Sequence, residues 1–237
     1  MRITGDYHTH SKYSKNNHGK STIAENVKSA EEKGLASYGI SDHGPAHYLF
    51  GIKRKNIKKA KSELEGLKNN TDLNLYFGVE ANLVGKDGKI DLKEDEIKLL
   101  DNLIVGYHRG TINNIYCPLR KIFAPEKQKE INTNAYLNCL DRYNVAIISH
   151  INTYIKVDLE KVCKKAKEKG TLIELNNKHI DFSEEEAKQL IESGCNFIVS
   201  SDAHRKDNVA NVSRVLEFIE KYDIPRDRIV NIDKIYK

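Results

Sequence analysis

The sequence repeats one pattern about seven times: a short run of apolar, often β-branched residues, followed by a stretch with helical spacing. Most runs are almost continuously apolar, which is typical of strands that are covered on both faces. Such an alternation predicts a parallel sheet flanked by helices. We expect strands to end near His8, Ser41, Glu80, Tyr107, His150, Asn176 and Ser201, and the clearest runs are 36–41, 73–80, 102–108, 145–150, 171–176 and 196–201.

The segments between these runs carry helix signals. Thr22 and Glu25 have the spacing of a capping box, and Gly170 and Gly194 are typical stop signals. Further helices are expected at 127–142, 158–169, 183–193 and 207–222, and a turn-containing excursion at 84–91. The chain of 237 residues is long enough for one large α/β domain. We therefore predict a single domain over residues 1–237, either a β/α barrel or an open doubly wound sheet.

The composition excludes several classes of protein. Apolar residues make up 39% and charged residues 31%, an ordinary globular profile. The sequence has neither the apolar run of a signal peptide nor the long apolar stretch of a membrane span, so we expect a cytoplasmic protein with no membrane partner. Four widely spaced cysteines without a C-x-x-C pair indicate reduced, mostly buried thiols.

The net charge of +5 is modest and favours small anionic partners over nucleic acid. The most basic segment runs from Lys53 to Lys61. Ile57 and Ala60 within it, and Leu64 and Leu67 after it, have helical spacing, so we expect its lysines to form a solvated helix face.

Polar residues stand at or just past the end of every predicted strand. In a β/α barrel these positions meet on one face, where active sites are built. Together with His18 in the first loop, this face accounts for seven of the nine histidines. The strand-end residues are His8, His10, Asp42, His43, Glu80, His108, His150, Asn176, Asp202 and His204.

These residue types in this pattern point to metal binding. In His8-x-His10 both imidazoles lie on one side of an extended segment, and Asp202-x-His204 repeats the spacing. Nitrogen and oxygen donors without thiolates suit Zn, Mn or Fe. At about three or four ligands per ion, the candidates imply two or three divalent ions. The candidate ligands are His8, His10, His18, His43, Glu80, His108, His150, Asp202 and His204.

Simpler interpretations apply to single residues. One histidine at a strand end is more often hydrogen-bonded at a barrel rim than a ligand, so the joint pattern carries the prediction. His47 and His179 do not fit that pattern. His47 follows Pro45 in a loop and could face a substrate, but we expect ordinary surface roles for both histidines. Residues 19–22 resemble the end of a P-loop, but Ser14 stands where its first glycine is required.

Seven motifs in this order resemble the PHP (polymerase and histidinol phosphatase) family, especially its small stand-alone members. They are Asp6-Tyr7-His8-Thr9-His10, Ser41-Asp42-His43-Gly44-Pro45, Gly78-Val79-Glu80-Ala81-Asn82, Gly106-Tyr107-His108, Ile148-Ser149-His150, Glu174-Leu175-Asn176-Asn177 and Ser200-Ser201-Asp202-Ala203-His204. The resemblance implies a distorted seven-stranded β/α barrel with a two- or three-metal site. One difference is that Ile151 follows His150, where the family commonly has proline.

The resemblance also implies how the ligands are shared. One ion would bind His8, His10, Glu80 and Asp202, a second Glu80, His108 and His150, and a third His18, His43 and His204. Glu80, Asp202 and His204 are the expected catalytic residues.

The resulting hypothesis is a metal-dependent phosphoesterase that acts on a small phosphomonoester, as a histidinol phosphatase does, through a metal-bound hydroxide. Arg109 and Arg205 are the candidates for binding the substrate phosphate. Asp6 and Asp42 are expected to orient imidazoles.

Three alternatives use the same residues. A phosphodiesterase or nuclease would need a long basic groove. Another metallohydrolase of this barrel type would often have a lysine at a strand end. A non-catalytic metal-binding module would lack some ligands, whereas none is missing here.

Overall fold

The computed structural model describes residues 1–233, and seven parallel strands form one sheet in it. Each strand is hydrogen-bonded to the next one along the chain. This sequential order is that of a barrel, since a doubly wound sheet places its first strand in the interior. The strands are β1 (Gly5–Asp6), β2 (Ser37–Ile40), β3 (Asn74–Asn82), β4 (Asn102–Gly106), β5 (Ile147–Ile148), β6 (Leu172–Asn176) and β7 (Phe197–Ser200).

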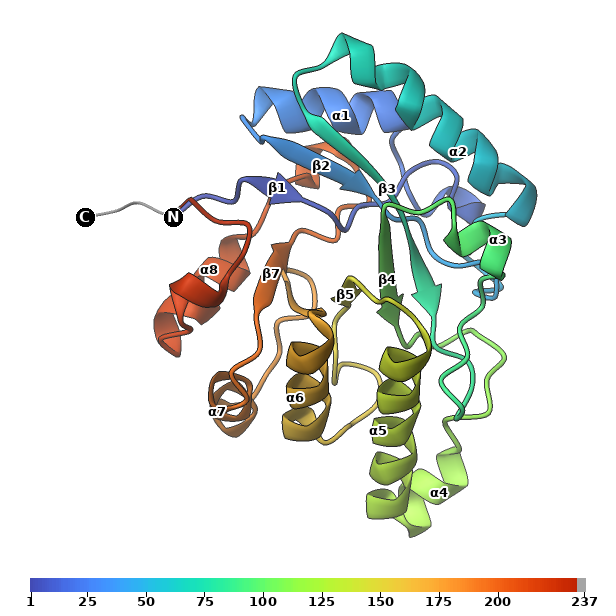
Figure 1. Ribbon diagram of the computed structural model, residues 1–237, viewed down its shortest axis with the longest axis vertical. Coiled ribbons are helices and arrows are strands. Elements are labelled where there is room, and N and C mark those ends of the chain that lie inside the picture. Colours follow the sequence, from blue (N-terminus) through green and yellow to red (C-terminus); the bar gives the residue numbers. More distant parts are fainter. Residues whose placement is uncertain (234–237) are drawn as a thin grey trace.

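Helices lie on the outside of the strands, with α1 and α2 beside β1 to β3 and α5 to α7 beside the later strands (Figure 1). They are α1 (Ile23–Glu32), α2 (Arg54–Leu67), α3 (Glu94–Ile97), α4 (Pro118–Phe123), α5 (Pro125–Arg142), α6 (Leu159–Lys169), α7 (Glu184–Glu192) and α8 (Ser213–Lys221). Short 3-10 turns are η1 (Lys15–Asn17), η2 (Lys68–Asn70), η3 (Lys206–Asn208) and η4 (Arg226–Arg228). No helix of the described part is long and apolar enough to cross a membrane.

The C-terminal segment closes the gap between β1 and β7, the two ends of the sheet. The Asn231 carboxamide donates to the carbonyls of Gly5, at 2.8 Å, and Val199, at 2.7 Å. The Asn231 side-chain oxygen accepts a hydrogen bond from the Val199 amide at 2.9 Å. Nearer the strand ends, Thr9 forms a parallel bridge with Ala203. A nearly closed barrel results, and the predicted barrel is confirmed.

The interior of the barrel contains both apolar and charged side chains, which lie next to each other on neighbouring strands. Parallel neighbours in register point to the same face, and Ile104 pairs with both Glu80 and Ile147. In the same way, Glu174 pairs with Ile198. Three buried isoleucines thus form an apolar layer next to two fully buried carboxylates, and the polar layer extends towards the C-terminal strand ends.

Most of the predicted helices are present. Thr22 and Glu25 form the capping box of α1, and Gly170 ends α6 in the left-handed conformation at φ 72°. The excursion at 84–91 is a turn closed by a bridge between Leu83 and Ile90. The lysines of α2 outline its exposed face, as expected. All four cysteines are free, and three of them are buried.

Several boundaries differ from those expected: β3 continues past Glu80 to Asn82, and β5 covers only Ile147–Ile148. Two further differences have a cause that the contacts show. β1 ends at Asp6, because the chain then crosses towards β7. The helix expected at 207–222 begins only at Ser213. There, the Ala210 amide donates to Asp6 at 2.9 Å, and Ala210 has a positive φ of 59°. The segment is therefore bound to the end of β1 and cannot continue a helix.

We predict that Asn231→Ala destabilises the fold by about 2–4 kcal/mol, because it leaves buried groups of β1 and β7 unpaired. Urea unfolding measures this change. Asn69→Ala, at an exposed asparagine, is the matched control and should change the unfolding free energy by less than about 0.5 kcal/mol. Equal effects of the two substitutions would show that Asn231 does not close the barrel.

Candidate metal centre

All nine predicted ligand side chains gather at the C-terminal ends of the strands. A cavity of about 250 Å³ opens there. His8 and His10 follow β1, His18 follows η1, His43 follows β2, Glu80 is in β3, His108 follows β4, His150 follows β5, and Asp202 and His204 follow β7. The barrel thus brings together residues that are almost 200 positions apart in the chain.

Glu80 lies at the centre of the group, and its side chain is completely buried. One carboxylate oxygen is 2.7 Å from His150 Nε2 and 3.1 Å from His108 Nε2. The other is 2.8 Å from His43 Nδ1 and 3.3 Å from His8 Nε2. The two oxygens therefore face different imidazoles, as a bridging carboxylate would require.

Asp202 is a second centre of contacts. Its Oδ1 is 3.3 Å from His10 Nε2 and 3.3 Å from His204 Nδ1. The Nε2 atom of His18 is 2.7 Å from that of His204 and 3.2 Å from that of His43. His10 and His43 also stack, with ring centroids 4.4 Å apart. The two carboxylates and their imidazoles thus form one continuous group.

Several atoms of this group are buried and make no hydrogen bond of good geometry in the described residues, even where another candidate ligand is near, as Glu80 is to His43 Nδ1 at 2.8 Å. A buried polar atom is costly unless it is satisfied, so these atoms need a partner that the protein does not provide. Three ligand groups have donor atoms within 4.8 Å of one another: His8, His10 and Asp202; His10, His43 and His204; and His43, Glu80 and His108. The unpartnered atoms are His8 Nε2, both ring nitrogens of His10, His43 Nδ1, Glu80 Oε2 and Asp202 Oδ1.

Buried side chains behind the group orient the imidazoles. His8 Nδ1 is hydrogen-bonded to Glu174 at 2.6 Å, and His108 Nδ1 to the Asn82 oxygen at 2.8 Å. Asn82 is held in turn by Asp91. Fixing one ring nitrogen directs the other towards the centre. Sequence reasoning assigned no such roles to Glu174 and Asn82, although each points inward from a buried strand.

The expected orienting role of Asp6 and Asp42 is wrong. Asp42 accepts hydrogen bonds from Ser11 and Ser14, and Asp6 accepts from Ser201 and the Ala210 amide. Neither carboxylate is hydrogen-bonded to an imidazole in the described residues. Asp42 thus fixes the loop after His10, and Asp6 fixes the loop on either side of Asp202.

The backbone at the strand ends is unusual. His150 and Asp202 have positive φ angles of 27° and 53°, which residues other than glycine rarely adopt. Such strain is often found at functional sites. Gly106 supplies space nearby, since a Cβ atom there would lie 2.9 Å from His150 and 3.3 Å from His108. The local backbone is therefore shaped around the side chains of the site.

Burial and charge divide the imidazoles into two types. Burial alone would lower the pKa of His8, but Glu174, Glu80 and Asp202 raise it well above its usual value. Burial lowers the pKa of His43 to about 3 despite the adjacent Glu80. Burial would raise the pKa of Glu80, but the surrounding histidines hold it well below its usual range. The site thus holds buried carboxylates next to imidazoles whose pKa values are shifted in opposite directions, upward for His8 and downward for His43.

The wall of the cavity contains residues with which a substrate can interact. Of the two arginines considered for phosphate binding, Arg109 lines the cavity, whereas Arg205 is exposed and does not. Lys178, which sequence reasoning missed, lines it instead, with its Nζ 3.6 Å from Asp202 Oδ1 and 3.1 Å from His204 Nδ1. Lys178 is in the loop after β6. Lysine is common in loops, so its residue type alone did not indicate a position in the cavity wall.

The expected surface role of His47 is wrong. Its side chain is only 5% exposed and lines the cavity, and its Nδ1 accepts the Phe50 amide at 3.1 Å. The loop after β2 pairs with the loop after β4 through a bridge between His47 and Thr111, which turns His47 inward. His179 also lines the cavity, so the same correction applies to it.

The fold and this group of donors define a β/α-barrel protein with a candidate site for several metal ions. The model of the PHP domain family matches residues 6–198. The chain belongs to the PHP domain family.

Named relatives agree with this assignment. The chain is 32% identical to a protein of Caldanaerobacter subterraneus subsp. tengcongensis named "Probable phosphatase", over 99% of this chain and 90% of that protein. It is 34% identical to another of that name from a Thermoanaerobacter species, over 98% and 92% of the two chains.

A solved structure has the same fold. It is the histidinol phosphate phosphatase of Lactococcus lactis subsp. lactis, in complex with zinc, L-histidinol and phosphate. The TM-score is 0.61 at 16% identity, and the alignment covers 94% of each chain.

We predict that His8 is protonated and His43 neutral at pH 7 in metal-free protein, and ¹⁵N NMR of the histidine rings measures both states. Because the pKa of His8 is raised, its interaction with Glu174 stabilises the metal-free fold fully below about pH 6.5. This stabilisation disappears as the pH rises through the raised pKa. Glu174→Gln should lower the pKa of His8, and a neutral His8 in the metal-free wild type would contradict this electrostatic picture.

Proposed function

We propose that this protein is a metal-dependent phosphoesterase that hydrolyses a small phosphomonoester. The observation that carries the proposal is the set of buried nitrogen and oxygen atoms without partners around Glu80 and Asp202. Their lone pairs converge in a region closed to bulk water, which suits cations. The Lactococcus lactis neighbour, whose structure contains zinc and phosphate, supports the same interpretation.

Two or three divalent ions would be held by the nine candidate ligands named above. The absence of thiolate donors suits Zn, Mn or Fe. The contacts support Glu80 as the residue shared between ions. His10 and His43 each belong to two of the compact groups, so the ions would be close neighbours.

When bound, such ions act as Lewis acids that activate water and stabilise charge on phosphoryl oxygens. The chain's own residues would do the rest. Arg109 and Lys178, on the cavity wall, would bind and orient the phosphate. Glu174 and Asn82 would hold the His8 and His108 rings in place. Arg205 stays a candidate only for contacts outside the cavity.

The cavity favours a monoester over a polynucleotide. Its volume of about 250 Å³ suits a small ligand. The solvated lysines of α2 are not among its lining residues, so they do not extend it into a basic groove. The two alternatives are a phosphodiesterase activity and another metallohydrolase reaction. The assay below distinguishes both from hydrolysis of a phosphomonoester.

A comparison of p-nitrophenyl phosphate with bis-p-nitrophenyl phosphate, with Mn, Zn and Fe supplied in turn, tests the proposal. We expect metal-dependent release of p-nitrophenol with a higher kcat/KM for the monoester. Preference for the diester would favour the phosphodiesterase alternative. Failure to hydrolyse either ester with any of the metals would refute the phosphoesterase assignment.

Glu80→Ala should lower kcat/KM by roughly 100- to 1,000-fold, because a bridging carboxylate supports several kcal/mol of metal-dependent stabilisation. Folding should persist, since His8 and His150, whose pKa values Glu80 helps to raise, can lose their protons when this charge is removed. Circular dichroism checks the fold, and Glu192→Ala, at an exposed position on α7, is the matched control. Full turnover in Glu80→Ala would rule out a bridging role.

A further inference from the structure

A second cavity, of about 200 Å³, lies beside the candidate metal centre. Arg109 and Tyr154 line both cavities. The Tyr154 ring centroid is 5.6 Å from that of His150, and the Arg109 guanidinium lies 6.0 Å from the centre of the Tyr154 ring. Arg109 and Tyr154 therefore form a wall that the two cavities share.

The charged residues that line this second cavity are all cationic. Four of its lining residues are cationic, namely Arg109, Lys121, Lys129 and Lys156, and none is acidic. Lys156 is paired with Glu186 at 2.7 Å. In the described residues the other three have no carboxylate within 4.0 Å, although many of the chain's other surface lysines form such pairs.

The polar floor of the cavity is fixed. Gln128 and Asn132 are buried, and the Gln128 amide donates to Asn132 at 2.7 Å and to the Ile115 carbonyl at 2.9 Å. Asn132 donates to the Lys156 carbonyl at 2.8 Å. These bonds hold α5 against the loop after β5, so the cavity keeps its shape without a ligand.

The start of α5 adds to the positive potential. Pro125 is its first residue, and no side chain of the described residues caps this end, as is also the case for α2, α4 and α8. The first turn of a helix carries partial positive charge. Glu126 lies in the same turn and offsets part of this charge, so the positive potential of the cavity comes chiefly from its cationic side chains.

We propose that the second cavity binds an anionic group, a phosphate or a carboxylate, on the leaving-group side of the substrate. This inference rests on the proposed function and makes it more specific. With one phosphate at the metal centre beside Arg109, the rest of the molecule would pass Tyr154 and reach Lys121 and Lys129, which have no carboxylate within 4.0 Å in the described residues. Tyr116 and Ile155 offer apolar contact to its carbon skeleton.

This substrate class differs from the ligand of the Lactococcus lactis neighbour. L-histidinol, present in that structure, carries an ammonium group. A cavity lined by four cationic side chains and, among the described residues, by no acidic one repels an ammonium group and attracts an anion. The leaving group preferred by this protein should therefore be opposite in charge to histidinol.

A series of alkyl phosphates of equal chain length tests the proposal. The far end carries a hydroxyl, a carboxylate, a second phosphate or an ammonium group, and several chain lengths are compared. We expect kcat/KM to be about tenfold higher with an anionic end than with the hydroxyl, and lowest with the ammonium. The carboxylate and phosphate arms distinguish the two anionic groups. Raising the ionic strength should reduce the differences.

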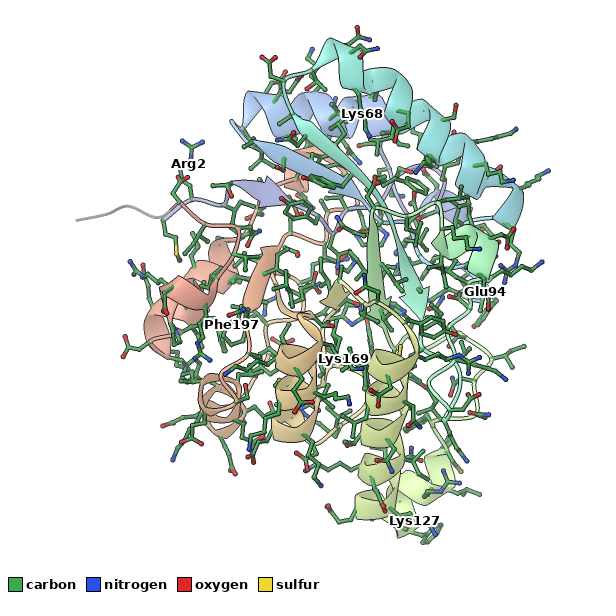
Figure 2. All side chains as sticks on the ribbon, in the orientation of Figure 1. Arg2, Lys68, Glu94, Lys127, Lys169 and Phe197 are labelled. Carbon is green, nitrogen blue, oxygen red and sulfur yellow. The ribbon has the colours of Figure 1, made fainter. Side chains whose placement is uncertain are left out.

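Substitutions locate the effect. Lys129→Gln should lower the ratio of kcat/KM for the anionic ester to that for the hydroxyl ester by about fivefold, and the double variant with Lys121→Gln by more. Lys127→Gln is the matched control, because Lys127 projects from the same end of α5 at the edge of the molecule and does not line the cavity (Figure 2). It should leave the ratio unchanged.

The outcomes separate this inference from the proposed function. Hydrolysis of all four esters with equal kcat/KM, or an unchanged ratio in the double variant, would overturn the anionic cavity and leave the phosphoesterase intact. No hydrolysis of any ester with Mn, Zn or Fe would overturn both.

Discussion

The structure around the site depends on one buried carboxylate, Glu80, which lies among imidazoles with no access to water. A buried charge is tolerated only when opposite charges or strong donors compensate it. In the protein alone, compensation comes from His108, His8, His43 and His150, which lower its pKa. These four side chains come from four different strand ends, so the barrel must hold all of them in place at once.

The rest of the fold serves this requirement. Isoleucines on β4, β5 and β7 form the apolar layer next to the carboxylates, and Asn231 joins β1 to β7 where the sheet would otherwise stay open. Asp6 and Asp42 do not touch the imidazoles, but they fix the loops on which His10 and Asp202 stand. Positioning is thus divided between residues that aim the rings and residues that anchor the backbone.

Much of the site could be predicted from the sequence because the sequence shows approximately where each strand ends. Continuous apolar runs show where a strand stops, and the next polar residue must lie on the common face. Glu174 and Asn82 could not be assigned in the same way, because an inward direction within a strand depends on register. Lys178 and His47 depend on how loops pair across the barrel mouth, for which local sequence has no periodic signal. Arg205 directly follows the candidate ligand His204, but adjacent side chains point in different directions. Its place in the sequence therefore did not show that it lies outside the cavity.

The composition of the cavity walls sets what the site would accept. The proposed metal centre would attract one phosphate, and the adjacent second cavity adds the side chains of Lys121 and Lys129, which have no carboxylate within 4.0 Å in the described residues. Elemental analysis of purified protein, combined with anomalous diffraction at the metal edges, tests the central claim most directly. It should find two or three transition-metal ions per chain, within coordination distance of Glu80 and Asp202. Protein from metal-supplemented culture with no ion between these two carboxylates would contradict it.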